Sequence, residues 1–174
     1  MTLDDLEDGL RKFDGTAISS LSEIRAACRG RAGYLNELAA FCADARASVS
    51  AGATWLLKAE LAEGVELAPE VTAQIVGALD RVVGWQAALH LCQSVEMLEL
   101  TSAQAGRFLE WARGYADHAR PFLRAWSLHA RAILGHRFPE FEDEAAIALR
   151  TAEADAAASV RARARNLRKL LGAK

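Results

Sequence analysis

Apolar residues along this chain recur at the three- and four-residue spacing of an α-helix. No segment sustains the period-two alternation of apolar and polar residues that marks a half-buried strand. Good helix formers dominate the composition, and only three prolines interrupt them. We therefore expect an all-α fold of about ten helices joined by short breaks. The predicted helices span residues 2–13, 17–29, 32–44, 48–63, 69–80, 82–99, 102–117, 120–135, 140–154 and 157–171.

The predicted breaks carry residues that begin or end helices. Gly30 follows the second helix, where a left-handed C-cap favours glycine. Pro121 opens the eighth helix, because a proline in the first turn loses no hydrogen bond. Thr101 or Ser102 is suited to capping the seventh. The acidic run at 140–144 suits a helix N-terminus, where carboxylates face the positive end of the helix dipole.

Four stretches resemble one another at nearly regular intervals, and each lies in the second helix of a predicted pair. They are residues 50–58, 84–92, 123–131 and 160–168, which align on Ala53, Ala87, Ala125 and Ala162. The steps between these alanines are 34, 38 and 37 residues. The helices at 82–99 and 120–135 each have two broad apolar faces, so each needs neighbours on both sides. A middle layer of stacked helix pairs has this requirement.

The segments Leu-Arg-Ala-Trp (123–126) and Val-Arg-Ala-Arg (160–163) resemble the second helix of HEAT-type repeats. The resemblance covers roughly residues 48–171. It departs from that class in its shorter steps and in Gln86, which replaces the arginine. It implies a right-handed α-solenoid of about five antiparallel helix pairs; a compact helical bundle is the alternative.

We expect one repeat domain over residues 1–174 because no linker divides the chain. Within it, residues 1–46 would form N-terminal helix pairs or a cap, and residues 47–171 the repeat pairs. Residues 172–174 would be a frayed tail.

The composition is that of a folded chain with little net charge. The 174 residues are 52% apolar and 25% charged, and the formal net charge is −2. No overall field therefore attracts nucleic acid or an anionic membrane. Cys28, Cys42 and Cys92 lie far apart, which predicts buried thiols, a reducing compartment and no metal site. Without a signal peptide or a long apolar run, the chain is expected to be soluble and cytoplasmic, with no membrane contact.

Charge divides between the two expected layers of helices. Counted with the residues at their ends, the second helices of the last four pairs (48–63, 82–99, 120–137 and 157–171) carry ten cations and four acids. The first helices of the last three pairs (66–81, 102–118 and 140–155) carry four cations and eleven acids. Within the last three second helices, the residue before the anchor alanine and the residue six after it lie seven apart on one face. These residues are Gln86 and Gln93, then Arg124 and Arg131, then Arg161 and Arg168.

This stripe, which we expect to be exposed, turns basic toward the C-terminus. The predicted partner-binding residues are Arg120, Arg124, Arg131, Arg161, Arg165 and Arg168. An alternative interpretation is a solvated polar face, with arginines favoured by the helix dipole and paired with acids of the adjacent layer.

No motif for catalysis or cofactor binding occurs. HExxH, GxxxxGK, GxGxxG and GxSxG are all absent, and the four histidines have no ligand spacing. We therefore expect no cofactor and no enzymatic activity. The four tryptophans lie mostly among apolar neighbours and are expected to pack between helices. An exposed tryptophan beside the arginines would favour stacking on nucleic-acid bases.

Two functions are compatible with these features. The first is a protein-interaction or scaffold module that binds an acidic partner segment on a basic concave face. The second is DNA binding, because some HEAT-like proteins are alkylpurine DNA glycosylases that hold duplex DNA in a basic groove. Such enzymes need an acid in the groove, and Glu96 and Glu99 are the nearest ones here. The sequence leaves the oligomeric state open.

Overall fold

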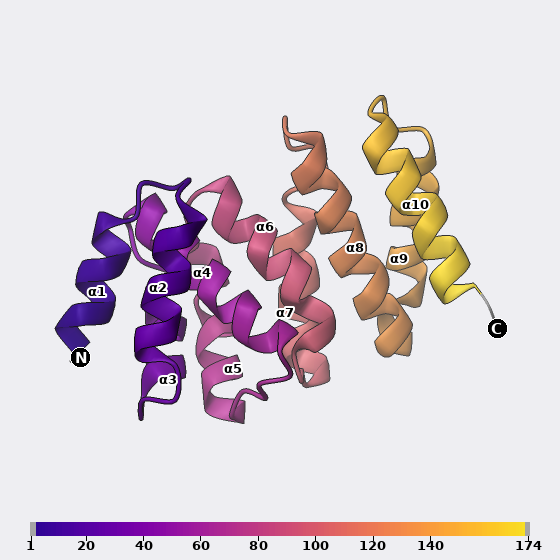
Figure 1. The fold of residues 1–174 in the computed structure, drawn as a ribbon. Coiled ribbons are helices and arrows are strands. Elements are labelled where there is room, and N and C mark those ends of the chain that lie inside the picture. The colour runs from indigo at the N-terminus through magenta and orange to yellow at the C-terminus, as the bar shows by residue number, and fades with distance from the viewer. Residues whose placement is uncertain (1–2, 173–174) are drawn as a thin grey trace. The chain divides into compact units, whose positions relative to one another are not determined.

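The computed structural model describes the backbone of residues 3–172 and the side chains of residues 6–172. Over this range the chain is all-helical, with ten α-helices and no strand, as predicted (Figure 1). The α-helices are α1 (Leu3–Lys12), α2 (Ile18–Cys28), α3 (Tyr34–Phe41), α4 (Ala47–Ala62), α5 (Pro69–Gly77), α6 (Trp85–Ser94), α7 (Ser102–Arg113), α8 (Pro121–Arg137), α9 (Glu142–Glu153) and α10 (Ala158–Leu171). The short 3-10 segments are η1 (Leu79–Arg81), η2 (Val95–Met97) and η3 (Pro139–Phe141).

The helix ends follow the local signals in the sequence. Thr101 caps α7 in a capping box, in which its side chain accepts from the Gln104 N–H and the Gln104 side chain accepts from the Thr101 N–H. Pro121 lies in the first turn of α8. Gly30 has a φ of 81°, the left-handed conformation expected after α2. All three 3-10 segments fall where α-helix was expected, η2 entirely and η1 and η3 in part.

The chain forms two compact units, residues 1–99 and residues 100–174. The predicted boundary between residues 46 and 47 falls inside the first unit. Of the predicted frayed tail, residues 173–174 lie outside the described range, and Gly172 is the C-cap of α10.

In the first unit, α4 packs against α1, α2, α3 and α6. Its core includes Leu10, Leu21, Leu38 and Leu56, each with no exposed surface. Gly52 of α4 allows the close approach of α1, because a Cβ atom there would lie 2.8 Å from Cδ2 of Leu10. All three cysteines of the chain are buried and none is in a disulfide, as expected for Cys28, Cys42 and Cys92.

A buried ion-pair network also joins α2 to α4. The Glu60 side chain is only 1% exposed; its carboxylate accepts from Nε of Arg25 at 2.8 Å and forms an ion pair with Nε of Arg29 at 3.3 Å. Both arginines also pair with Glu63, at 2.6 and 2.5 Å. The acids of this network therefore belong to α4 and its C-cap, and the cations to α2 and its C-cap.

In the second unit, α8 packs against α7, α9 and α10, and α10 also packs against α9. The core of its last three helices is built largely from alanines together with Leu128, Val160 and Leu167. Gly135 sets the distance between α8 and α9, because a Cβ atom there would overlap the Ala145 side chain. Small residues thus permit the close packing of these helices.

Candidate interaction site

Arg124 of α8 is held by a two-sided set of hydrogen bonds. Its Nη1 donates to the backbone oxygen of His118 at 2.8 Å, in the turn before α8. Its Nε and Nη2 donate to the two carboxylate oxygens of Asp155 at 3.0 and 2.8 Å, in the turn after α9. The bonds from Arg124 lower the pKa of the Asp155 carboxyl. Arg124 thus links the turn before α8 to the turn that follows α9.

Arg131 lies seven residues after Arg124 on the same face of α8, and its side chain binds an acid of α9. Its Nε and Nη2 donate to Oε1 of Glu144 at 3.0 and 2.6 Å, and Arg113 of α7 reaches the same oxygen at 3.3 Å. The Arg131 and Arg124 side chains are only 12% and 15% exposed. The expectation of an exposed stripe is therefore wrong at these two positions, because acids of α9 and its following turn reach them. Whether they bind a partner stays a prediction.

Arg161 and Arg168 occupy the matching positions on α10. Arg168 pairs with Glu153 of α9, and both side chains are nearly half exposed, at 47% and 43%. Nη1 of Arg161 donates to the backbone oxygens of Asp155 and Ala156 at 2.6 and 2.8 Å. Among the described residues, no acidic side chain accepts a hydrogen bond from Arg161.

The two remaining predicted positions, Arg120 and Arg165, are both exposed, and so is Lys169, which the prediction omitted. No acid within the described part of the chain pairs with Arg165 or Lys169. The helix that carries them, α10, contains five cations and no acid. This end of the second unit therefore has fewer matched cations than α8, whose Arg124 and Arg131 pair with acids of α9 and its following turn.

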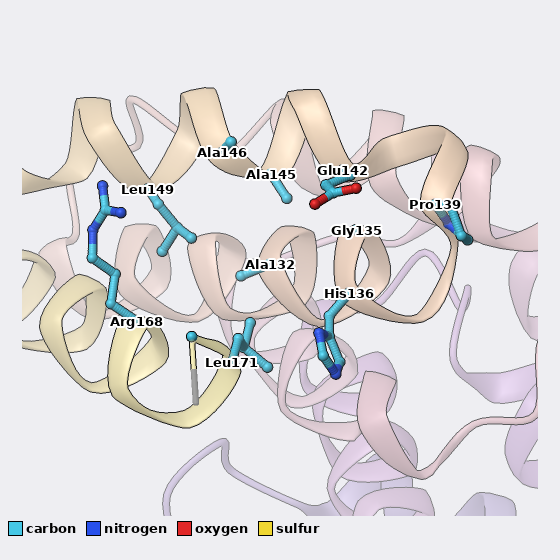
Figure 2. A pocket seen from close by; sticks show the side chains of 11 residues that line it. Ala132, Gly135, His136, Pro139, Glu142, Ala145, Ala146, Leu149, Arg168 and Leu171 are labelled. Atoms are coloured by element: carbon cyan, nitrogen blue, oxygen red, sulfur yellow. The ribbon is translucent and has the colours of Figure 1, made fainter. Parts of the chain in front are cut away.

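A groove of about 580 Å³ lies beside Arg168 at the open end of α8, α9 and α10 (Figure 2). Its apolar lining includes Ala132, Ala146, Leu149 and Leu171. Figure 2 shows Arg168 and Leu149 at one end of the groove, and Glu142, His136 and Pro139 at the other. Arg168 thus joins a basic helix to an apolar recess.

A second groove, of about 430 Å³, lies between α8 and α9. Arg124 and Arg131 line it, together with Asp117 and Asp155. Its charges are therefore mixed, and the arginines in it already bind carboxylates. The groove beside Arg168 is the better candidate for receiving a partner.

One arginine that the sequence prediction did not single out stacks on a tryptophan. The guanidinium of Arg163 in α10 lies 3.9 Å from the ring centre of Trp126 in α8, a cation–π distance. The His129 ring lies edge-on to Trp126, with 4.9 Å between ring centres. Burial, and then the nearby charge of Arg163, lower the pKa of His129 to about 4. This cluster packs α10 against α8.

The described residues hold no cluster of His, Cys, Asp and Glu that would bind a metal ion. None of the helices in the described range is long and apolar enough to cross a membrane. The chain matches no protein-family model, and neither the curated proteins nor the solved structures contain a match to it. The site must therefore be interpreted from its own geometry.

Proposed function

We propose that this chain is a non-enzymatic protein-interaction module that binds an acidic segment of another protein through α10. The single observation that carries the proposal is the charge of that helix. Over Ala158–Leu171 it has five cations and no acid, and Arg165 and Lys169 are exposed without a described acidic partner. Opposite charge favours association with an acidic partner and steers its approach.

The proposal includes a HEAT-like stack of helix pairs. Its support is a contact repeated in the second unit. Nη1 of Arg124 donates to the backbone oxygen six residues earlier, and Nη1 of Arg161 does the same 37 residues further along. A repeat of the sequence pattern thus coincides with a repeat of the side-chain contact, as expected when successive helix pairs share one structure. A compact bundle remains the competing fold.

Duplex DNA is the competing ligand. The observation in its favour is the contact of Arg163 with Trp126, because arginines and aromatic rings together stack on bases. Against it stands the overall charge of −2. A ligand that gains affinity mainly from phosphate contacts would also meet the acidic helix α9, which packs against α10.

Fluorescence anisotropy at low salt tests the proposal with two labelled probes, a glutamate-rich peptide and a short DNA duplex. The doubly reversed variant Arg165→Glu/Lys169→Glu is compared with Lys12→Glu/Arg81→Glu, which changes the net charge equally in the first unit. We expect the first variant to weaken peptide binding by about tenfold and the control to change it by less than about twofold. Tighter binding of DNA than of the peptide would favour the alternative, and no binding of the peptide would contradict the proposal.

A further inference from the structure

The helices α8 and α10 are two copies of one pattern. Arg124 and Arg161, Arg131 and Arg168, Leu134 and Leu171, and Gly135 and Gly172 form four identical pairs, each separated by 37 residues. Buried positions also correspond, since Leu123 and Val160 are both in the core. The segment that packs against α8 therefore indicates what kind of segment would fit the matching residues of α10.

The segment that packs against α8 begins at η3 and continues through α9 and the turn after it. Phe141 lies against Gly106 of α7, where an added Cβ atom would be 3.1 Å from its ring, and Ala145 lies against Gly135 of α8. Glu144 then binds Arg131, and Asp155 binds Arg124 through both carboxylate oxygens. An aromatic residue, small residues and two acids eleven positions apart thus make this contact.

The corresponding surface on α9 and α10 is open. It includes the groove of about 580 Å³ in Figure 2, which has Arg168 at its edge and is also lined by Ala132, Gly135 and His136 of α8. Ala146 stands 37 residues after Leu109 of α7, so the smaller side chain leaves room for an incoming apolar group. Leu149, the counterpart of the buried Ala112, is only partly buried.

Two arginines on one face of α10 have capacity for carboxylates: Arg168, which lines the groove, and Arg161, seven residues nearer the start of the helix. Arg161 makes the same bond to its own turn as Arg124, but its Nε and Nη2 meet no described carboxylate, whereas those of Arg124 hold Asp155. The pair between Arg168 and Glu153 is nearly half exposed on both sides. Such a pair contributes little to stability and exchanges readily for a competing acid.

We infer that this groove receives an acidic helix of a partner protein, docked as α9 docks on α7 and α8. A bulky apolar side chain enters the recess beside Ala146 and Leu149, and two carboxylates bind Arg161 and Arg168. This assignment rests on the proposed function and adds to it the class of partner, an acidic amphipathic helix. Paired N–H donors of arginine match a carboxylate in geometry as well as in charge.

The test uses the whole protein and a helix-stabilised peptide of residues 138–156 of this chain. A hydrocarbon staple joins positions 147 and 151, which are exposed in α9. Two protein variants, Ala146→Trp and Arg161→Gln, are compared with the matched controls Ala26→Trp and Arg81→Gln at exposed sites of the first unit. We expect each groove variant to weaken binding by about tenfold and each control by less than about twofold.

A double-mutant cycle then tests whether the Asp155 carboxylate of the peptide binds Arg161 of the protein. Replacing Asp155→Asn in the peptide should cost less affinity with the Arg161→Gln protein than with the unchanged protein, because the two changes remove one contact. Binding that is lost in Arg165→Glu/Lys169→Glu but unchanged in Ala146→Trp and Arg161→Gln would overturn the groove assignment and leave the proposed function standing. Failure of both this peptide and the glutamate-rich peptide to bind would overturn both.

Discussion

The two units of this protein place their ion pairs with opposite polarity. In the first unit, a buried acid of α4, Glu60, is held by cations of α2 and its C-cap. In the second unit, cations of α8 are held by acids of α9 and its following turn. The first arrangement binds its charges within the unit. In the second unit, the arginines of α8 recur at matching positions on α10, where fewer acids pair with them. This repetition leaves a basic surface on α10.

The largest expected effect concerns the buried acid of the first unit. Glu60→Ala leaves Arg25 without its buried partner, and breaking a buried pair from one side should cost about 3 kcal/mol of unfolding free energy. Glu63→Ala, at a side chain 45% exposed, should cost less than about 1 kcal/mol. Urea unfolding followed by circular dichroism measures both. Equal losses would mean that the network is not the anchor of the first unit.

The next effect concerns pH and involves one histidine in each unit. Burial, and then the charge of Lys58, lower the pKa of His90 to about 4, and the pKa of His129 is lowered similarly. Because the unfolded histidines take up protons below their ordinary pKa while the folded ones do not, stability is present above pH 6.5 and falls toward pH 4. Each histidine should contribute a loss of about 2 kcal/mol between pH 7 and pH 5.

Urea unfolding across this range should show the loss reduced by half in His90→Gln. His118→Gln is the control, since it replaces a histidine in the turn before α8, outside the helices that carry His90 and His129. An unchanged pH slope in His90→Gln would show that His90 does not stay neutral in the folded protein.

The smallest effect compares matching arginines within the second unit. Arg124→Gln removes a largely buried, two-oxygen contact with Asp155 and should cost about 1 kcal/mol, whereas Arg168→Gln removes a half-exposed pair and should cost less than about 0.5 kcal/mol. Thermal unfolding of the two variants provides the comparison. If Arg168→Gln were the more damaging, α10 would depend on its charges for folding, which contradicts a role in binding.

Local features of the fold could be predicted from the sequence, because they depend on neighbouring residues. The capping box at Thr101 and the proline at 121 fixed the starts of α7 and α8 closely. The turn at η3 was missed, since the acidic run favours a helix N-terminus and does not reveal that Pro139–Phe141 tightens into a 3-10 turn.

The candidate site was only partly predictable for the same reason. Helical spacing placed Arg124 and Arg131 on one face, but it could not show that Asp155 and Glu144, distant in sequence, lie within reach of them. The contact of Arg163 with Trp126 also joins two helices and leaves no signal in either one alone. The alternation of basic and acidic layers was the one sequence signal of these pairs.

The docking of an acidic helix on α9 and α10 is tested most directly by a nuclear magnetic resonance titration of the ¹⁵N-labelled protein with the stapled peptide of residues 138–156. We predict saturable shifts that are largest for the groove residues Ala146, Leu149 and Arg168, and for Arg161 on the same face of α10. Shifts concentrated in α4 and α6, or shifts that never saturate, would contradict the account.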